Sequence, residues 1–160
     1  RAPGEMALVL GVPTVDIDNG LCEVLLTRNV AQAPHFIPPS ELAAADNALA
    51  SVGIRASRVP APAWPEELVG ARERFNEAFA RIPHRYAGNV LLVAHGDTVA
   101  QFVAQTRGIS DDSVYAVPLC SAAGADLACS ADPRRGGELE WQRSRLLGDI
   151  LVLDDMVADE

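Results

Sequence analysis

The sequence predicts an α/β protein, a three-layer sandwich in which helices flank a mostly parallel sheet. Three patterns in the chain support this fold class. Apolar residues recur at helical spacing over 68–82, an unbroken apolar run follows at 90–94, and a second helical pattern covers 97–107. An apolar run between two helices is typical of a strand that is buried on both faces of a parallel sheet.

Length and composition predict one folded domain over residues 1–160. Of the 160 residues, 49% are hydrophobic and 22% are charged, which is the balance of a globular rather than a disordered protein. The net charge of -9 argues against a surface that binds nucleic acid or anionic membranes. No apolar stretch approaches the roughly 20 residues of a membrane span. We therefore expect neither nucleic acid nor membrane among the partners.

The cysteines indicate the redox environment. Cys22, Cys120 and Cys129 are odd in number and lack a CxxC spacing. They predict neither a zinc site nor a disulfide framework, and they favour a reducing, cytoplasmic location. All 13 basic residues are arginine. An anion site in this chain must therefore use arginine, histidine or main-chain N–H groups.

The first half of the chain contains weaker structural signals. Residues 5–10 read as the end of a helix with Gly11 as its stop, and 14–17 alternate like a strand before a turn at 18–20. Ser40 is placed to cap a helix that runs to Gly53. Residues 51–65 are predicted to be irregular.

The second half contains the stronger signals. A long helix is predicted from Pro65, with Glu66 and Glu67 in its first turn. Its apolar face consists of Leu68, Ala71, Phe75, Ala78, Phe79 and Ile82. A buried strand is predicted at 89–94, and the helix over 97–107 ends at Gly108. Strands at 114–117 and 125–129 are expected to pair as a hairpin, and a turn at 132–137 precedes a further strand-like stretch at 138–143.

His95 stands where the predicted buried strand ends and a helix begins. Ligands of open α/β sheets bind beyond the carboxyl ends of the strands, and a helix N-terminus attracts anions. Gly96 allows the main chain to approach a ligand closely, and Asp97 or Thr98 can cap the helix. The pattern indicates a phosphate or carboxylate site. The alternative is a structural histidine that is hydrogen-bonded at a strand end.

Four stretches carry a resemblance to a known family. The stretch "GNVLLVAHGDTVAQFV" resembles the second-histidine segment of the histidine phosphatase superfamily, which has the phosphoglycerate mutase-like fold. The stretch "PEELVGARERFNEAFARI" resembles the helix before that segment, and "VDIDNGLCEVL" resembles the family's strand and Leu-x-Glu element. The stretch "FIPPSEL" is similar to an insertion in the branch that contains the suppressor-of-T-cell-receptor-signalling phosphatases.

The resemblance implies a phosphomonoester hydrolase that works through a phosphohistidine, without metal or cofactor. His95 matches the second histidine, which hydrogen-bonds the transferring phosphoryl group. Glu23 matches the acid that protonates the leaving oxygen; its alternative is a solvated carboxylate in a turn. Gly96 and Arg1 would contribute to phosphate binding. A phosphorylated small molecule or a phosphoprotein would be the substrate, and the family allows a homodimer.

The sequence departs from the family in one essential respect, because it contains no Arg-His-Gly motif to supply the nucleophile. His35 and His84 are predicted to be solvent-facing loop residues instead. Two accounts stay open. The first strand and nucleophile loop are missing from this sequence, or the domain is a catalytically inactive interaction module. A phosphoglycerate-type mutase is a weaker third reading, since no loops that would shield a phosphorylated intermediate are identifiable.

Arginines elsewhere have ordinary interpretations. Arg72 and Arg74 are predicted to be solvated or paired with Glu73 and Glu77 on the same helix. Arg134 and Arg135 are expected to be exposed in the turn at 132–137.

Overall fold

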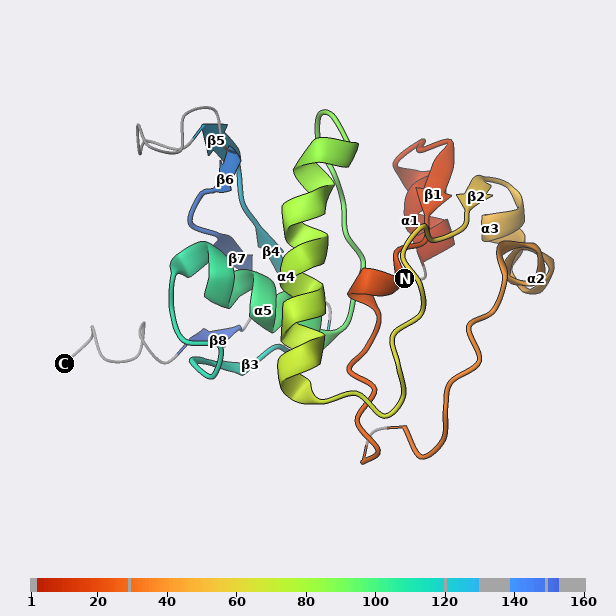
Figure 1. Cartoon of the computed structure of the whole chain (residues 1–160). Helices are drawn as coiled ribbons and strands as arrows, with labels where there is room; N and C mark the ends of the chain where they lie inside the picture. Colours follow the sequence, from red (N-terminus) through yellow and green to blue (C-terminus); the bar gives the residue numbers. More distant parts are fainter. Residues whose placement is uncertain (1–2, 29, 120, 130–138, 149, 153–160) are drawn as a thin grey trace. The chain divides into compact units, whose positions relative to one another are not determined.

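The computed structural model describes residues 3–28, 30–119, 121–129, 139–148 and 150–152 (Figure 1). The chain divides into two compact units, Arg1–Glu67 and Leu68–Glu160. Both units combine helices with short strands, so the prediction of a mixed α/β protein is confirmed at this level. The prediction that 1–160 forms one domain stays a prediction.

The first unit contains short elements, with longer connections over residues 22–38 and 56–67. The elements are α1 (Pro3–Val9), β1 (Thr14–Asp16), the 3-10 turn η1 (Asn19–Leu21), α2 (Pro39–Ala45), α3 (Asn47–Ala50) and β2 (Gly53–Arg55). The strands β1 and β2 pair in parallel, with Val15 opposite Ile54. Strand β2 lies in the stretch predicted to be irregular. It is a strand because β1 supplies its hydrogen-bond partners, which its own sequence pattern does not indicate.

The predicted helix stop at Gly11 is confirmed. Gly11 has a left-handed φ of 65°, which other residues adopt with strain. Its N–H donates to the carbonyl of Leu8 (3.2 Å), and the N–H of Val12 donates to the carbonyl of Ala7 (2.9 Å). This pair of bonds is a Schellman motif, which satisfies carbonyls that the helix end leaves open.

The predicted single helix over 40–53 is wrong, because the stretch forms two helices. The first starts at Pro39, whose fixed φ suits the first helical position and whose missing N–H is not needed there. It ends at Asp46, which begins the second helix. The Asp46 carboxylate accepts hydrogen bonds from the N–H groups of Ala48 (2.8 Å) and Leu49 (3.2 Å). An aspartate that offers its own main chain these bonds competes with continuation of the helix.

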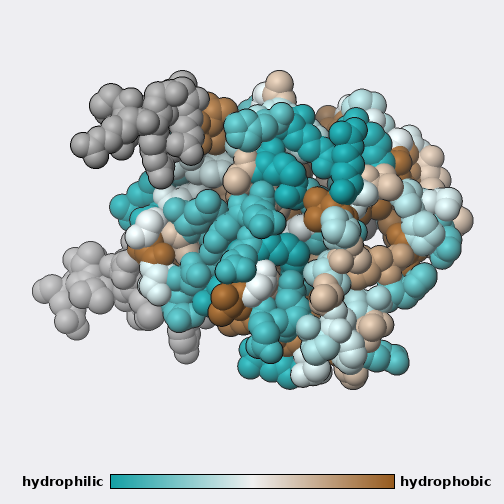
Figure 2. All heavy atoms as spheres, in the orientation of Figure 1, coloured by the Kyte–Doolittle hydropathy of each residue, from teal (hydrophilic) through white to brown (hydrophobic). Residues whose placement is uncertain are grey.

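The second unit is built around two helices and a set of short strands. These are α4 (Leu68–Arg85), α5 (Gly96–Arg107), β3 (Val114–Ala116), β4 (Ala122–Gly124), β5 (Leu127–Cys129), β6 (Leu139–Trp141), β7 (Arg145–Leu147) and β8 (Leu151–Val152). Helix α4 starts three residues later than predicted. Its predicted apolar face is confirmed except for the half-buried Leu68, since the structure buries Ala71, Phe75, Ala78, Phe79 and Ile82. The opposite, exposed face of α4 is hydrophilic (Figure 2).

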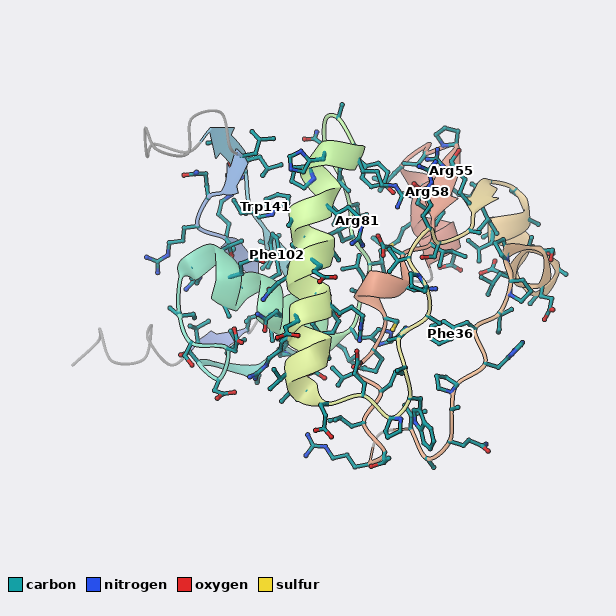
Figure 3. All side chains as sticks on the ribbon, in the orientation of Figure 1. Phe36, Arg55, Arg58, Arg81, Phe102 and Trp141 are labelled. Carbon is teal, nitrogen blue, oxygen red and sulfur yellow. The ribbon has the colours of Figure 1, made fainter. Side chains whose placement is uncertain are left out.

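An aromatic cluster joins α4, α5 and β6. The rings of Phe79 and Phe102 meet edge to face with centroids 5.1 Å apart. Phe102 meets Trp141 in the same way at 5.5 Å, and Figure 3 labels these two residues. The indole Nε1–H of Trp141 donates to the carbonyl of Phe79 at 3.3 Å. Each edge-to-face pair contributes about 0.5–1.5 kcal/mol beyond the area it buries. The cluster therefore fixes α5 and the strands against α4.

The strands of the second unit pair differently from the prediction. The expected hairpin between 114–117 and 125–129 is wrong, because β3 pairs with β8, β4 with β7 and β5 with β6, all antiparallel. Ala122 lies opposite Leu147, and Leu127 lies opposite Trp141. Ala122 and Leu127 are five positions apart, whereas their partners Leu147 and Trp141 are six positions apart. The strand that contains β6 and β7 therefore has one extra residue between the two paired stretches. The predicted turn at 132–137 lies outside the described residues.

The predicted buried strand at 89–94 is also wrong for this structure. The segment returns from the end of α4 to the start of α5 without forming a strand (Figure 1). Val90, Leu91 and Val93 are 40%, 57% and 47% exposed. None of the main-chain hydrogen bonds found for the described residues involves this segment. An apolar run becomes a buried strand only when neighbouring strands pair with it, and the described residues supply none.

The single-domain prediction can be tested with the two tryptophans, because Trp64 belongs to the first unit and Trp141 to the second. In urea, the Trp64→Phe variant keeps Trp141, so its fluorescence reports the second unit. The Trp141→Phe variant keeps Trp64, so its fluorescence reports the first unit. If 1–160 is one domain, the fluorescence midpoint of each variant will coincide with its own far-UV circular dichroism midpoint. Fluorescence midpoints that fall on opposite sides of the circular dichroism transition would show two units that unfold independently.

Candidate functional site

The candidate site is the N-terminus of α5. His95 is the N-cap residue, with extended main-chain angles (φ -94°, ψ 168°), and its side chain makes no capping hydrogen bond. Its carbonyl accepts the first hydrogen bond, from the N–H of Val99 at 3.1 Å. Gly96 is the first helical residue. The prediction that Asp97 or Thr98 caps this helix is therefore wrong by two or three positions.

The end of α5 is open to solvent. His95, Gly96 and Asp97 are exposed, whereas Thr98 is 2% exposed and belongs to the interior. The helix has 12 residues, long enough to present a substantial positive dipole end. A solute can therefore reach both the imidazole ring and the helix end. This geometry suits an anion, as the sequence indicates.

The fold itself does not require glycine at position 96. A Cβ atom added to Gly96 would lie 3.8 Å from the carbonyl oxygen of Val117, which is an ordinary van der Waals contact. Its φ is also outside the left-handed range in which glycine is favoured. The packing gives no reason for a glycine at this position, whereas close approach of a ligand to the main chain does give one.

Glu23 lies in the first unit, in the segment after η1. The carboxylate Oε1 accepts a hydrogen bond from the N–H of Val24 at 2.8 Å. Glu23 is half-buried, and Val24 and Leu25 after it are 0% and 4% exposed. The acid role of Glu23 and its alternative, a solvated carboxylate in a turn, both stay predictions. The segment is held by Glu66, which exchanges two hydrogen bonds with the main chain of Leu25 (3.1 and 3.3 Å) instead of starting α4 as predicted.

The structure brings together only part of the predicted set. His95 and Gly96 are consecutive at one helix end, and Glu23 belongs to the other unit. Arg1 lies outside the described residues. His35 and His84 are exposed as predicted, although His84 lies in the last turn of α4 and not in a loop. The described residues contain no group of acidic, histidine or cysteine side chains that could hold a metal ion.

Arg72 of α4 has a role that the sequence did not indicate. Its guanidinium donates to the Asp112 carboxylate at 2.7 Å and to the Asp111 carbonyl at 3.4 Å. The prediction that Arg72 is either solvated or paired with Glu73 and Glu77 is wrong. The true partners lie 39 and 40 positions along the chain, so no local spacing could have revealed them.

Gln101 of α5 completes this polar network. It is 4% exposed, and its Nε2 donates to Asn76 of α4 at 3.1 Å and to the Asp111 carboxylate at 3.0 Å. A buried amide that is satisfied on two sides is costly to displace. The network therefore fixes the N-terminal half of α5 against α4 and the segment after α5.

Comparison of the chain with protein-family models, curated proteins and solved structures found no match. The resemblance to histidine phosphatases thus stays a prediction. In the part of the chain that the structure describes, no helix has the length and apolar character needed to cross a membrane.

We expect Gly96→Ala to weaken phosphate binding about tenfold without destabilising the fold, because the added methyl group would meet the oxyanion but no protein atom closely. In the wild type, the phosphate affinity would be measured by titrations followed through the main-chain amide resonances of Gly96, Asp97 and Thr98. In the variant it would be measured through the amide resonances of Asp97 and Thr98. Gly70→Ala is the matched control, since Gly70 lies in α4 with open space around it. Equal affinities in the wild type and Gly96→Ala would contradict an oxyanion at this helix end.

Proposed function

We propose that this chain is part of a metal-independent, cytoplasmic phosphomonoester hydrolase of the histidine phosphatase superfamily, working through a phosphohistidine. The observation that carries the proposal is an exposed histidine at the N-cap of α5 that does not cap the helix, followed directly by an exposed glycine. The substrate would be a phosphorylated small molecule or a phosphoprotein. The family allows a homodimer.

The proposed chemistry assigns separate tasks to separate residues. His95 would donate a hydrogen bond to the phosphoryl oxygens, and the N-terminus of α5 would stabilise the same negative charge. Glu23 would protonate the leaving oxygen. The nucleophilic histidine must come from outside these 160 residues, because the sequence contains no Arg-His-Gly.

The three-layer sandwich with a mostly parallel sheet is part of the proposal. Residues 89–94 are apolar, stand between α4 and α5 in sequence, and take no part in the main-chain hydrogen bonds found for the described residues. Such a segment is the kind of chain that strand pairing on either side would stabilise.

A second candidate function is a non-catalytic interaction module on the same fold. The absence of Arg-His-Gly favours it, since no other histidine in the chain ends an apolar run. A phosphoglycerate-type mutase has less support. It needs loops that hold a phosphorylated intermediate away from water, and the sequence has no identifiable candidates.

The chain of 160 residues should show no turnover of an aryl phosphate and no acid-labile phosphohistidine. The native full-length protein should show both, if Arg-His-Gly follows an apolar strand in its upstream sequence. Steady-state assays and mass spectrometry on the two proteins would decide this. Turnover by the 160 residues that His95→Ala abolishes would make His95 the nucleophile. An inactive full-length protein would favour the interaction module.

In an active full-length protein, we expect His95→Ala to lower kcat about a hundredfold or more, because it removes a donor aimed at charge in the transition state. His84→Ala is the control, since His84 is exposed at the end of α4. Glu23→Gln should slow alkyl phosphates far more than aryl phosphates, whose leaving groups need little protonation. Equal losses on both substrates would count against Glu23 as the acid.

A further inference from the structure

Asn19 and Gly20 form the one asparagine–glycine pair in the sequence. An asparagine loses its side-chain amide when the main-chain nitrogen of the next residue attacks its Cγ atom. Glycine in the next position favours this reaction, because it has no Cβ atom to hinder the approach. The other four asparagines precede valine, alanine or glutamate. Asn19 is therefore the asparagine with the greatest intrinsic tendency to deamidate.

The structure holds both reacting groups in hydrogen bonds. The N–H of the buried Gly20 donates to the carboxylate of Asp18, the N-cap residue of η1, at 2.8 Å. The side-chain Nδ2 of Asn19 donates to the carbonyl of Val59 at 3.0 Å. Attack requires both bonds to open, since the Gly20 nitrogen must lose its proton and reach a Cγ atom whose amide is bonded to Val59. The folded first unit therefore slows the reaction.

Asn19 also attaches η1 to the connection over 56–67. Its main-chain N–H donates to Ser57 Oγ at 3.0 Å. The same Oγ accepts from the N–H of Val59 at 3.1 Å and donates to the Val59 carbonyl at 2.9 Å. Asn19, Ser57 and Val59 are all half-buried, so water compensates poorly for the loss of these bonds.

Deamidation would convert the attachment into a repulsive contact. The Gly20 nitrogen bonds to Asn19 Cγ, its proton leaves with the amide nitrogen as ammonia, and a cyclic imide forms. Water then opens the imide to aspartate or isoaspartate. The new carboxylate has no proton to donate and brings negative charge to the carbonyl oxygen of Val59. Isoaspartate also lengthens the main chain by one carbon atom before the buried Gly20.

We propose that Asn19 is a deamidation site that the folded first unit protects. Opening of this unit releases the Asn19–Gly20 pair, and the product then hinders η1 from binding the connection over 56–67 again. Because water is the only co-reactant and ammonia is lost, the modification marks chains whose first unit has opened. The inference concerns the first unit alone and does not rest on the proposed function.

Peptide mapping by mass spectrometry, on chains incubated in mildly alkaline buffer, measures the deamidation rate at Asn19. We expect the folded 160-residue chain to react about tenfold or more slowly than the same chain unfolded in urea, since two hydrogen bonds must open first. Asp18→Ala removes the acceptor of the Gly20 N–H and should raise the folded-state rate about tenfold. Asp46→Ala is the matched control and should raise the rate less, because Asp46 caps α3 of the same unit through Ala48 and Leu49.

Two results of this experiment would overturn the inference. One is an equal rate in the folded and the unfolded chain. The other is equal acceleration by Asp18→Ala and Asp46→Ala, since a general loss of stability in the first unit would then explain both.

The effect of the product is measured with Asn19→Asp in the Trp141→Phe background, where Trp64 fluorescence reports the first unit. The equilibrium constant for unfolding should rise about tenfold, because the Val59 carbonyl loses a donor. Asn47→Asp is the control, since Asn47 is exposed at the start of α3, where a carboxylate is tolerated. Equal stability of the two variants would overturn the proposed hindrance of closure.

Discussion

The packing of α4 on α5 is the contact on which the second unit depends. Phe75 and Phe79 are fully buried on α4, and burying a side chain of this size is worth about 1.5–3 kcal/mol. Phe102 brings α5 against the same face, and Trp141 adds the strands to the cluster. Without this contact α5 would be an amphipathic helix of 12 residues, too short to be stable in water by itself.

The position of the candidate site follows from that packing. A helix packed against α4 through Phe102 presents its N-terminus at a fixed place, with His95 and Gly96 exposed at the end. The polar network around Gln101, the residue before Phe102, adds a second attachment to α4. The apolar contacts of Phe102 and the hydrogen bonds of Gln101 thus both anchor the middle of α5.

The segment at 89–94 shows how far a local pattern can be trusted. Its apolar run predicts burial, and the same run is largely exposed because the described residues supply no strand to pair with it. Burial of apolar side chains is favourable, but a strand forms only when a neighbouring main chain can pair with it in register. In the first unit the opposite occurred. Strand β2 formed without a clear pattern of its own because β1 was available as a partner.

The sequence by itself determined the features that depend on neighbours three or four positions away. These include the buried face of α4, the glycine stops at Gly11 and Gly108, and the placement of His95 and Gly96 at the start of a helix. Tertiary structure alone decided the features that depend on distant partners. The ion pair of Arg72 with Asp112 and the antiparallel pairing of the strands belong to this group. The physical reason is range, since helix spacing and caps act within one or two turns, whereas strand register and ion pairs join residues whose separation no local pattern records.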